Sequence, residues 1–268
     1  DIFKEINFNK SHYNFIASLK VEDEEDRHYK EKKLNSLEEN GIHLPKEKQD
    51  ELIEISKQLM EYQSSFTKNA LNAKKKFNVK IDETMFSALS NDIRALFNED
   101  LVLNYSVSAV MKILKNCPLK ELRDLVYNED QKIANKGTDF DNTNNINQIV
   151  LLKNKRAKIL GFKNAGSQIL KETMAENIES AYSLLEEMRM SLMPIAKIER
   201  KEMEKFAKKK FGLNEIDFPT VNFIMEEMKS ELFKYHSDEE KKYLNIENVL
   251  STSLNLIEKM YGVSLVKE

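Results

Sequence analysis

Histidine is the residue type whose spacing would most directly reveal metal chemistry in this chain. The four histidines are His12, His28, His43 and His236. None has a second histidine three or four residues away, the spacing that places two imidazoles on one helix face to bind zinc. His236 precedes a short acidic run, Asp238 to Glu240, and one interpretation is a metal cluster. We favour a charged helix start, with acids near the positive end of the helix dipole, and we expect no metal ligand in this chain.

Other local arrangements do not indicate catalysis either. The sequence contains no GxGxxG and no Walker-type GxxxxGK[ST], so no phosphate cradle is recognisable. Cys117 is the sole cysteine, and we interpret it as a small buried hydrophobe rather than a nucleophile. Lysine triplets at 74–76 and 208–210 could contact nucleic-acid phosphates. The net charge of −3 argues against such a partner, so we interpret the triplets as solvated helix ends and expect no catalytic residue.

Composition favours a helical protein. Of the 268 residues, 41% are hydrophobic and 32% are charged, and only six are glycine and four are proline. Strands and tight hairpins need more turn residues than this, so long helices are expected. No apolar run approaches ~18 residues, so we expect no membrane partner. Asp1 is not an initiator methionine; we expect the true amino terminus to be missing and the protein to be cytoplasmic or organellar.

Apolar periodicity predicts where the main helices lie. Leu52, Ile55, Leu59, Tyr62 and Phe66 follow the spacing of one buried helix face, and Pro45 suits the first turn of that helix. A second stripe runs from Ile178 to Ile198 through Pro194, which predicts a kink or break near 190–194.

The ends of the elements are marked by turn residues. The stretch 137–147 is rich in Asn and Asp, and we predict an exposed loop. A last helix over 246–261 is predicted to end on Gly262, which suits a left-handed cap.

The most specific pattern is a helix that ends in Leu-Gly-aromatic, followed by a second helix closing on Met-Ala. Its residues are Arg156, Leu160, Gly161, Phe162, Met174 and Ala175. Further elements follow in order along the chain: Gly41–Pro45, Phe66–Asn69, Leu122-Arg123, Pro194, Glu199 and Tyr261-Gly262-Val263. Together they resemble the thimet oligopeptidase, neurolysin and oligopeptidase A family of zinc peptidases. One departure is the absence of tryptophan, including at 219–224, where the family usually has Trp-Asp.

This resemblance implies an all-α fold, a multi-helix array like the helical half of the neurolysin-like channel. Residues 1–268 would form one helical region of a larger peptidase, with a possible sub-division near 137–147. In that family zinc is held by two histidines of an HExxH helix and a downstream glutamate, which lie beyond the helical portion, so zinc is implied for the intact protein only. The resemblance implies that Arg156, Leu160, Gly161, Phe162, Met174, Ala175 and Gly262 are structural signature residues.

The resemblance also implies the partners. They would be short peptides and the missing catalytic half of the same protein, with this chain inactive alone and forming a wall of the substrate channel. Two alternatives remain open: a stand-alone helical interaction module or pseudo-peptidase, and a nucleic-acid binder.

Overall fold

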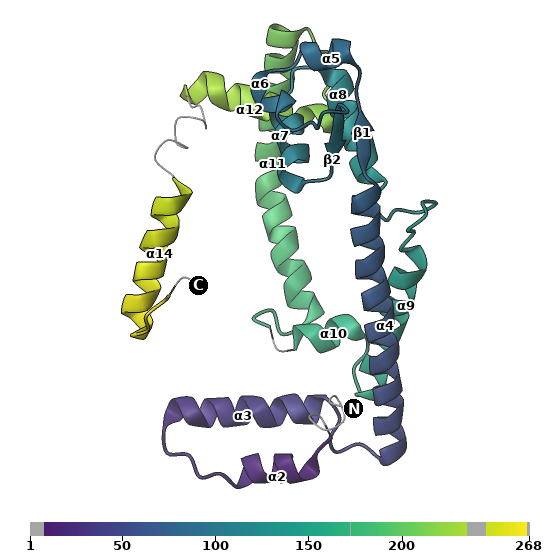
Figure 1. Cartoon of the computed structure of the whole chain (residues 1–268). Helices are drawn as coiled ribbons and strands as arrows, with labels where there is room; N and C mark the ends of the chain where they lie inside the picture. The colour runs from purple at the N-terminus through teal and green to yellow at the C-terminus, as the bar shows by residue number, and fades with distance from the viewer. Residues whose placement is uncertain (1–7, 172, 235–244, 267–268) are drawn as a thin grey trace. The chain divides into compact units, whose positions relative to one another are not determined.

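The structure is a computed structural model that describes residues 8–171, 173–234 and 245–266. Helices account for most of these residues, as Figure 1 shows, which confirms the predicted fold class. The elements are, in order, α2 (Lys10–Ser18), α3 (Glu24–Glu39), α4 (Lys46–Lys76), β1 (Asn78–Lys80), α5 (Glu83–Ser87), α6 (Asn91–Arg94), β2 (Val102–Asn104), α7 (Val107–Asn116), α8 (Lys120–Gln131), α9 (Thr143–Ile159), α10 (Ala165–Leu170), α11 (Ile178–Phe211), α12 (Phe218–Phe233) and α14 (Ile246–Tyr261).

The chain divides into two compact units. Unit 1 comprises residues 1–110 and 125–198, and unit 2 comprises residues 111–124 and 199–268. The expectation of one helical region with a sub-division near 137–147 stays a prediction; that stretch lies within unit 1.

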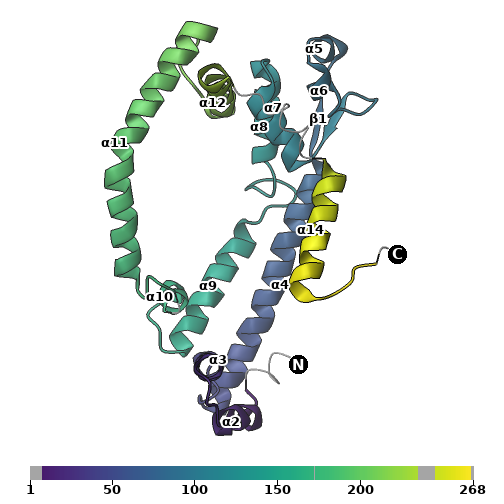
Figure 2. The ribbon, with the colours of Figure 1, turned by 90° about the vertical axis from the view of Figure 1, so that its left-hand side faces the viewer.

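The core of unit 1 lies between two long helices, α4 and α9, which run side by side in opposite directions (Figures 1 and 2). Ile55 and Leu59 of α4 are buried against Leu152 of α9. This confirms the apolar face predicted from the 3.6-residue period. Pro45 is the residue before the first turn of α4 rather than a member of it.

The described residues also contain a small two-stranded sheet. β1 and β2 pair antiparallel, with Val79 opposite Leu103, and both of these side chains are buried. Strands of three residues leave too short an alternation to be recognised from sequence, and no strand was expected here.

The polar stretch 137–147 is shorter and less exposed than predicted. α9 begins at Thr143, and the preceding residue, Asn142, is only 2% exposed. The Asn142 amide donates to the Phe66 carbonyl of α4 at 3.1 Å and accepts from Asn69 Nδ2 at 3.1 Å. Asn145, also buried, donates to the same Asn142 oxygen at 2.8 Å. This network links the start of α9 to α4. The prediction from composition, which placed these asparagines in an exposed loop, is therefore wrong for Asn142 and Asn145.

α11 continues through Pro194, so the helix does not break there, and the alternative of a kink stays a prediction. The apolar stripe is present, but between Ile178 and Ile198 it is not buried. Five of its large side chains are each 49% or more exposed: Leu185, Met188, Leu192, Ile195 and Ile198. Periodicity predicts that a helix has an apolar face, but not which element covers it.

Unit 2 has its own core, where the last turns of α11 meet α12. Ala207, Ile216, Phe223 and Ile224 are buried together there. α14 is amphipathic and has no buried residue. It ends on Gly262, whose φ of 63° is left-handed and whose N–H donates to the Glu258 carbonyl at 2.9 Å. The predicted glycine cap is therefore confirmed.

Candidate functional site

The Leu-Gly-aromatic pattern forms the C-terminus of α9. Gly161 has φ = 88°, and its N–H donates to the Lys158 carbonyl at 3.1 Å, while the Phe162 N–H reaches back to the Ala157 carbonyl at 2.9 Å. This pair of bonds is a Schellman motif, which satisfies the last carbonyls of a helix and requires a left-handed residue. Glycine is favoured at position 161 because it takes the left-handed conformation without the backbone strain that other residues incur.

The C-terminus of α3 has the same glycine-centred turn, and it packs against the C-terminus of α9. Gly41 has φ = 93°, and the Ile42 N–H donates to the Leu37 carbonyl at 3.3 Å. A Cβ added at Gly41 would lie 3.1 Å from Leu160 Cδ2. The two helix ends therefore pack closely, because Leu160 occupies the space that Gly41 leaves open.

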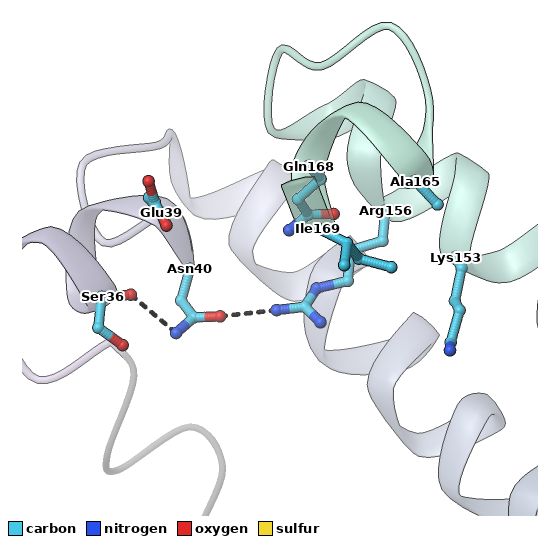
Figure 3. A pocket seen from close by; sticks show the side chains of 8 residues that line it. All are labelled: Ser36, Glu39, Asn40, Lys153, Arg156, Ala165, Gln168 and Ile169. Atoms are coloured by element: carbon cyan, nitrogen blue, oxygen red, sulfur yellow. Dashed lines mark hydrogen bonds between the residues drawn. The ribbon is translucent and has the colours of Figure 1, made fainter. Parts of the chain in front are cut away.

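Arg156 lies in the last turn of α9 and points toward the end of α3. Its Nη2 donates to Asn40 Oδ1 at 2.6 Å, and the Asn40 amide nitrogen donates to the Ser36 carbonyl at 2.8 Å (Figure 3). The second bond fixes which end of the Asn40 amide faces the guanidinium. Arg156 is thus held by a neutral amide that is itself held in place.

A pocket of about 400 Å³ opens beside this arginine. Figure 3 shows that α3, α9 and α10 all contribute to it. The residues lining it are Ser36, Glu39, Asn40, Lys153, Arg156, Ala165, Gln168 and Ile169. Of these, only Arg156 was singled out from the sequence. Lys153 lies three residues before Arg156 and so shares its helix face, which is a signal that the sequence did carry.

The charges around the pocket are unequal. Glu39 is paired with Lys171 at 2.6 Å. Neither Arg156 nor Lys153 has an ion pair within the described part of the chain. Burial lowers the pKa of the Arg156 guanidinium, which reflects the loss of water around a charge that no carboxylate balances.

The remaining signature residues are not brought to this pocket. Met174 and Ala175 lie in the turn after α10, which ends at Leu170, so the second helix does not close on Met-Ala as predicted. The Met174 side chain is fully exposed. Gly262 caps α14 in unit 2. The structural role expected for the seven signature residues as a set stays a prediction.

A second arginine, Arg123, is enclosed in unit 2. Its Nη1 donates to the carbonyls of Cys117 (2.7 Å) and Pro118 (3.1 Å), and its Nη2 donates to Thr220 Oγ1 at 3.4 Å. The guanidinium stacks on Phe223, 4.4 Å from the ring centroid. Cys117 is fully buried, as predicted. Burial raises the pKa of its thiol, which disfavours the reactive thiolate. The contacts of this cluster therefore indicate a structural role.

No group of three or more His, Cys, Asp or Glu side chains that could hold a metal ion occurs among the described residues. His43 packs edge-on against Tyr13, with ring centroids 4.9 Å apart. The acidic run after His236 lies outside the described residues. Among the residues described, no helix is both long enough and apolar enough to cross a membrane.

Comparison with known proteins adds the family. Residues 113–268, more than half of the chain, match the model of Peptidase family M3. Oligopeptidase A of Salmonella typhimurium is 23% identical over 244 residues, which cover 86% of this chain and 36% of that protein. A probable cytosolic oligopeptidase A of Arabidopsis thaliana is 26% identical, covering 85% of this chain and 35% of that protein. The thimet-like oligopeptidase of Dictyostelium discoideum is 28% identical over 192 residues, 69% of this chain.

The class of protein is therefore settled by sequence likeness and is consistent with the helical fold. The chain belongs to Peptidase family M3. It spans about a third of the length of the curated relatives that it matches.

Proposed function

We propose that this chain is a non-catalytic helical part of a zinc metallo-oligopeptidase that hydrolyses short peptides, and that it forms a wall of the substrate channel. The observation that carries the proposal is the match to Peptidase family M3 over residues 113–268. It is supported by relatives named oligopeptidase, which are similar along most of this chain although the chain spans only about a third of them.

The proposed zinc does not fit the residues of this chain. Its sequence contains no HExxH, and no acid-and-histidine group within the described ranges could hold a metal ion. A catalytic zinc usually has three protein ligands, for example two histidines one helix turn apart and a glutamate. We therefore place the zinc and the catalytic residues in other parts of the protein and assign none to this chain.

The exposed apolar stripe on α11 supports a role as part of a larger assembly. An exposed apolar face of this kind is typical of an interaction surface rather than of a surface that contacts only solvent. The proposed partners are the rest of the same protein and short peptides. The relatives include proteins named cytosolic and organellar, and we propose one of these locations here.

The proposal is tested first by reading the coding sequence after Glu268 in the source transcript. We expect an in-frame HExxH followed by a glutamate ligand. The longer protein should cleave a quenched fluorescent peptide and lose that activity with a zinc chelator, while the 268-residue chain should show no cleavage.

A second function is favoured by the same exposed stripe. A stop codon directly after Glu268, with no peptide cleavage, would contradict the peptidase proposal. It would support a stand-alone helical interaction module or pseudo-peptidase, in which the α11 face binds another protein.

A further inference from the structure

We propose that the pocket between α3, α9 and α10 binds a small organic anion through its carboxylate or phosphate group, with Arg156 as the anchoring residue and Lys153 as a second cation. This inference does not depend on the proposed peptidase function, because it rests on the residues of the pocket alone.

The first support is the unused hydrogen-bonding capacity of Arg156. A guanidinium carries five N–H donors in a planar fork that matches two oxygens of a carboxylate or phosphate. Only one bond is made within the described residues, from Nη2 to Asn40 Oδ1. Because Asn40 is held by Ser36, the fork is oriented before any ligand arrives.

The second support is the charge of the lining. Glu39 is the one carboxylate in the pocket, and it is engaged by Lys171. Arg156 and Lys153 thus contribute positive charge that no described carboxylate neutralises. Other arginines of the chain are satisfied differently: Arg189 pairs with Glu186, and Arg200 pairs with Glu204. Arg156 combines a half-buried guanidinium, no acid partner and an open cavity.

The third support is the size and the remaining lining of the cavity. Its volume of about 400 Å³ exceeds what a bare phosphate fills, so there is room for an organic body beside the anionic group. Ile169 and Ala165 offer apolar contact, and the Gln168 amide offers a donor and an acceptor. The ligand class is therefore a small molecule or peptide end that carries one oxyanion.

The test is isothermal titration calorimetry at low ionic strength with three probes. They are inorganic phosphate, an N-acetylated dialanine with a free carboxylate, and the same dipeptide as its C-terminal amide. We expect the free carboxylate or phosphate, or both, to bind and the amide to bind at least tenfold more weakly. Binding of the carboxylate alone would identify a peptide-like ligand, and binding of phosphate alone would identify a phosphorylated one.

Variants separate this site from non-specific attraction. Arg156→Gln should weaken binding about tenfold or more, the effect of losing a charge-assisted pair, and Lys153→Gln should weaken it about threefold. Lys158→Gln, an exposed lysine of the same helix that does not line the pocket, should leave affinity unchanged. If Arg156→Gln does not fold, Arg156→Lys, which keeps the charge but loses the fork, should still weaken binding.

Two results would overturn the proposal. One is that none of the probes binds at millimolar concentration. The other is that Lys158→Gln weakens binding as much as Arg156→Gln, since this would show attraction to a positive surface. Both results concern binding only, so neither bears on whether the longer protein cleaves peptides.

Discussion

Arg123 and Arg156 are the same residue type in two different settings. Arg123, in unit 2, is 2% exposed, donates to three oxygens and stacks on Phe223. Arg156, in unit 1, is half-buried, makes one hydrogen bond and faces a pocket. Burial lowers the pKa of both guanidinium groups.

The difference teaches that the partners of an arginine, rather than its burial, separate a structural role from a binding role. Around Arg123 the carbonyl oxygens of Cys117 and Pro118 depend on the guanidinium, and they would have no donor without it. Around Arg156 the dependence is reversed, because most of the guanidinium still lacks a partner. Substitution of Arg123 should therefore mainly lower the stability of the protein, whereas substitution of Arg156 should mainly weaken ligand binding.

The largest effect is expected at Arg123. Arg123→Met keeps much of the volume but leaves the two carbonyls without a donor, so we expect a loss of about 3 kcal/mol in the free energy of unfolding. Urea denaturation followed by far-UV circular dichroism would measure it. Arg189→Met, at an exposed i,i+3 pair, is the matched control and should change stability by less than about 0.5 kcal/mol. A loss at Arg123 no larger than at the control would contradict the structural role.

A smaller effect is expected at Asn142, which is buried in unit 1. Asn142→Ala removes one hydrogen bond each from the Phe66 carbonyl and from the amides of Asn69 and Asn145, so we expect a loss of about 2 kcal/mol. The same denaturation experiment measures it. Asn144→Ala, two residues further on and exposed, should be nearly neutral. Equal effects of the two substitutions would show that the network contributes nothing specific.

Gly161 tests how firmly the end of α9 is held. No atom lies within 4 Å of a Cβ at this position, so Gly161→Ala should cost only the strain of a left-handed backbone, about 1 kcal/mol. A thermal melt would measure the loss. Gly166→Ala, at a glycine without positive φ, is the control for left-handed strain, and its Cβ would meet only the Asn164 side chain closely, at 3.3 Å. An unchanged melting temperature for Gly161→Ala would mean that the Schellman motif is not needed.

Arg156 should contribute less to stability than any of these. Arg156→Gln removes one partly buried hydrogen bond, to Asn40, so we expect a loss below about 1 kcal/mol in the free energy of unfolding. The same substitution should weaken anion binding as described above. A destabilisation as large as that of Arg123→Met would break the comparison, because it would place both arginines among the structural residues.

The smallest effect is expected at Asp141, at the opposite end of α9, and only in a limited pH range. Hydrogen bonds from Thr143 and from the Gly137 N–H lower the pKa of its carboxyl. A depressed folded-state pKa stabilises the protein above the unfolded value of about 3.9, and that contribution is lost as the pH falls through the folded value. The melting temperature of Asp141→Asn should therefore lie below that of the parent at pH 6, and the gap should close toward pH 3. A gap that is constant with pH would contradict this assignment.

Local patterns were predicted well and distant contacts were not. The apolar face of α4 and the glycine cap of α14 follow from residues within a few positions of one another, which is why periodicity and cap chemistry sufficed. The burial of Asn142 depends on Phe66, 76 residues earlier in the chain. At Pro194 the sequence left a kink or a break open, and the structure excludes the break because α11 continues through the proline.

The pocket could be predicted only in part. Arg156 was picked out by its place before Leu160-Gly161-Phe162, and Lys153 shares its helix face. Asn40 is 116 residues away in sequence, and Gln168 comes from a different helix, so no spacing rule links them to Arg156.

The sequence by itself determined the helical class, the family and the two helix ends marked by Gly161 and Gly262, because these depend on composition, motif order and short-range hydrogen bonding. Only the tertiary structure decided that one arginine is enclosed by carbonyls while the other faces a cavity, and that the α11 stripe is exposed in this chain. Both outcomes depend on which distant elements meet, and the type of a side chain does not specify which distant residues become its neighbours.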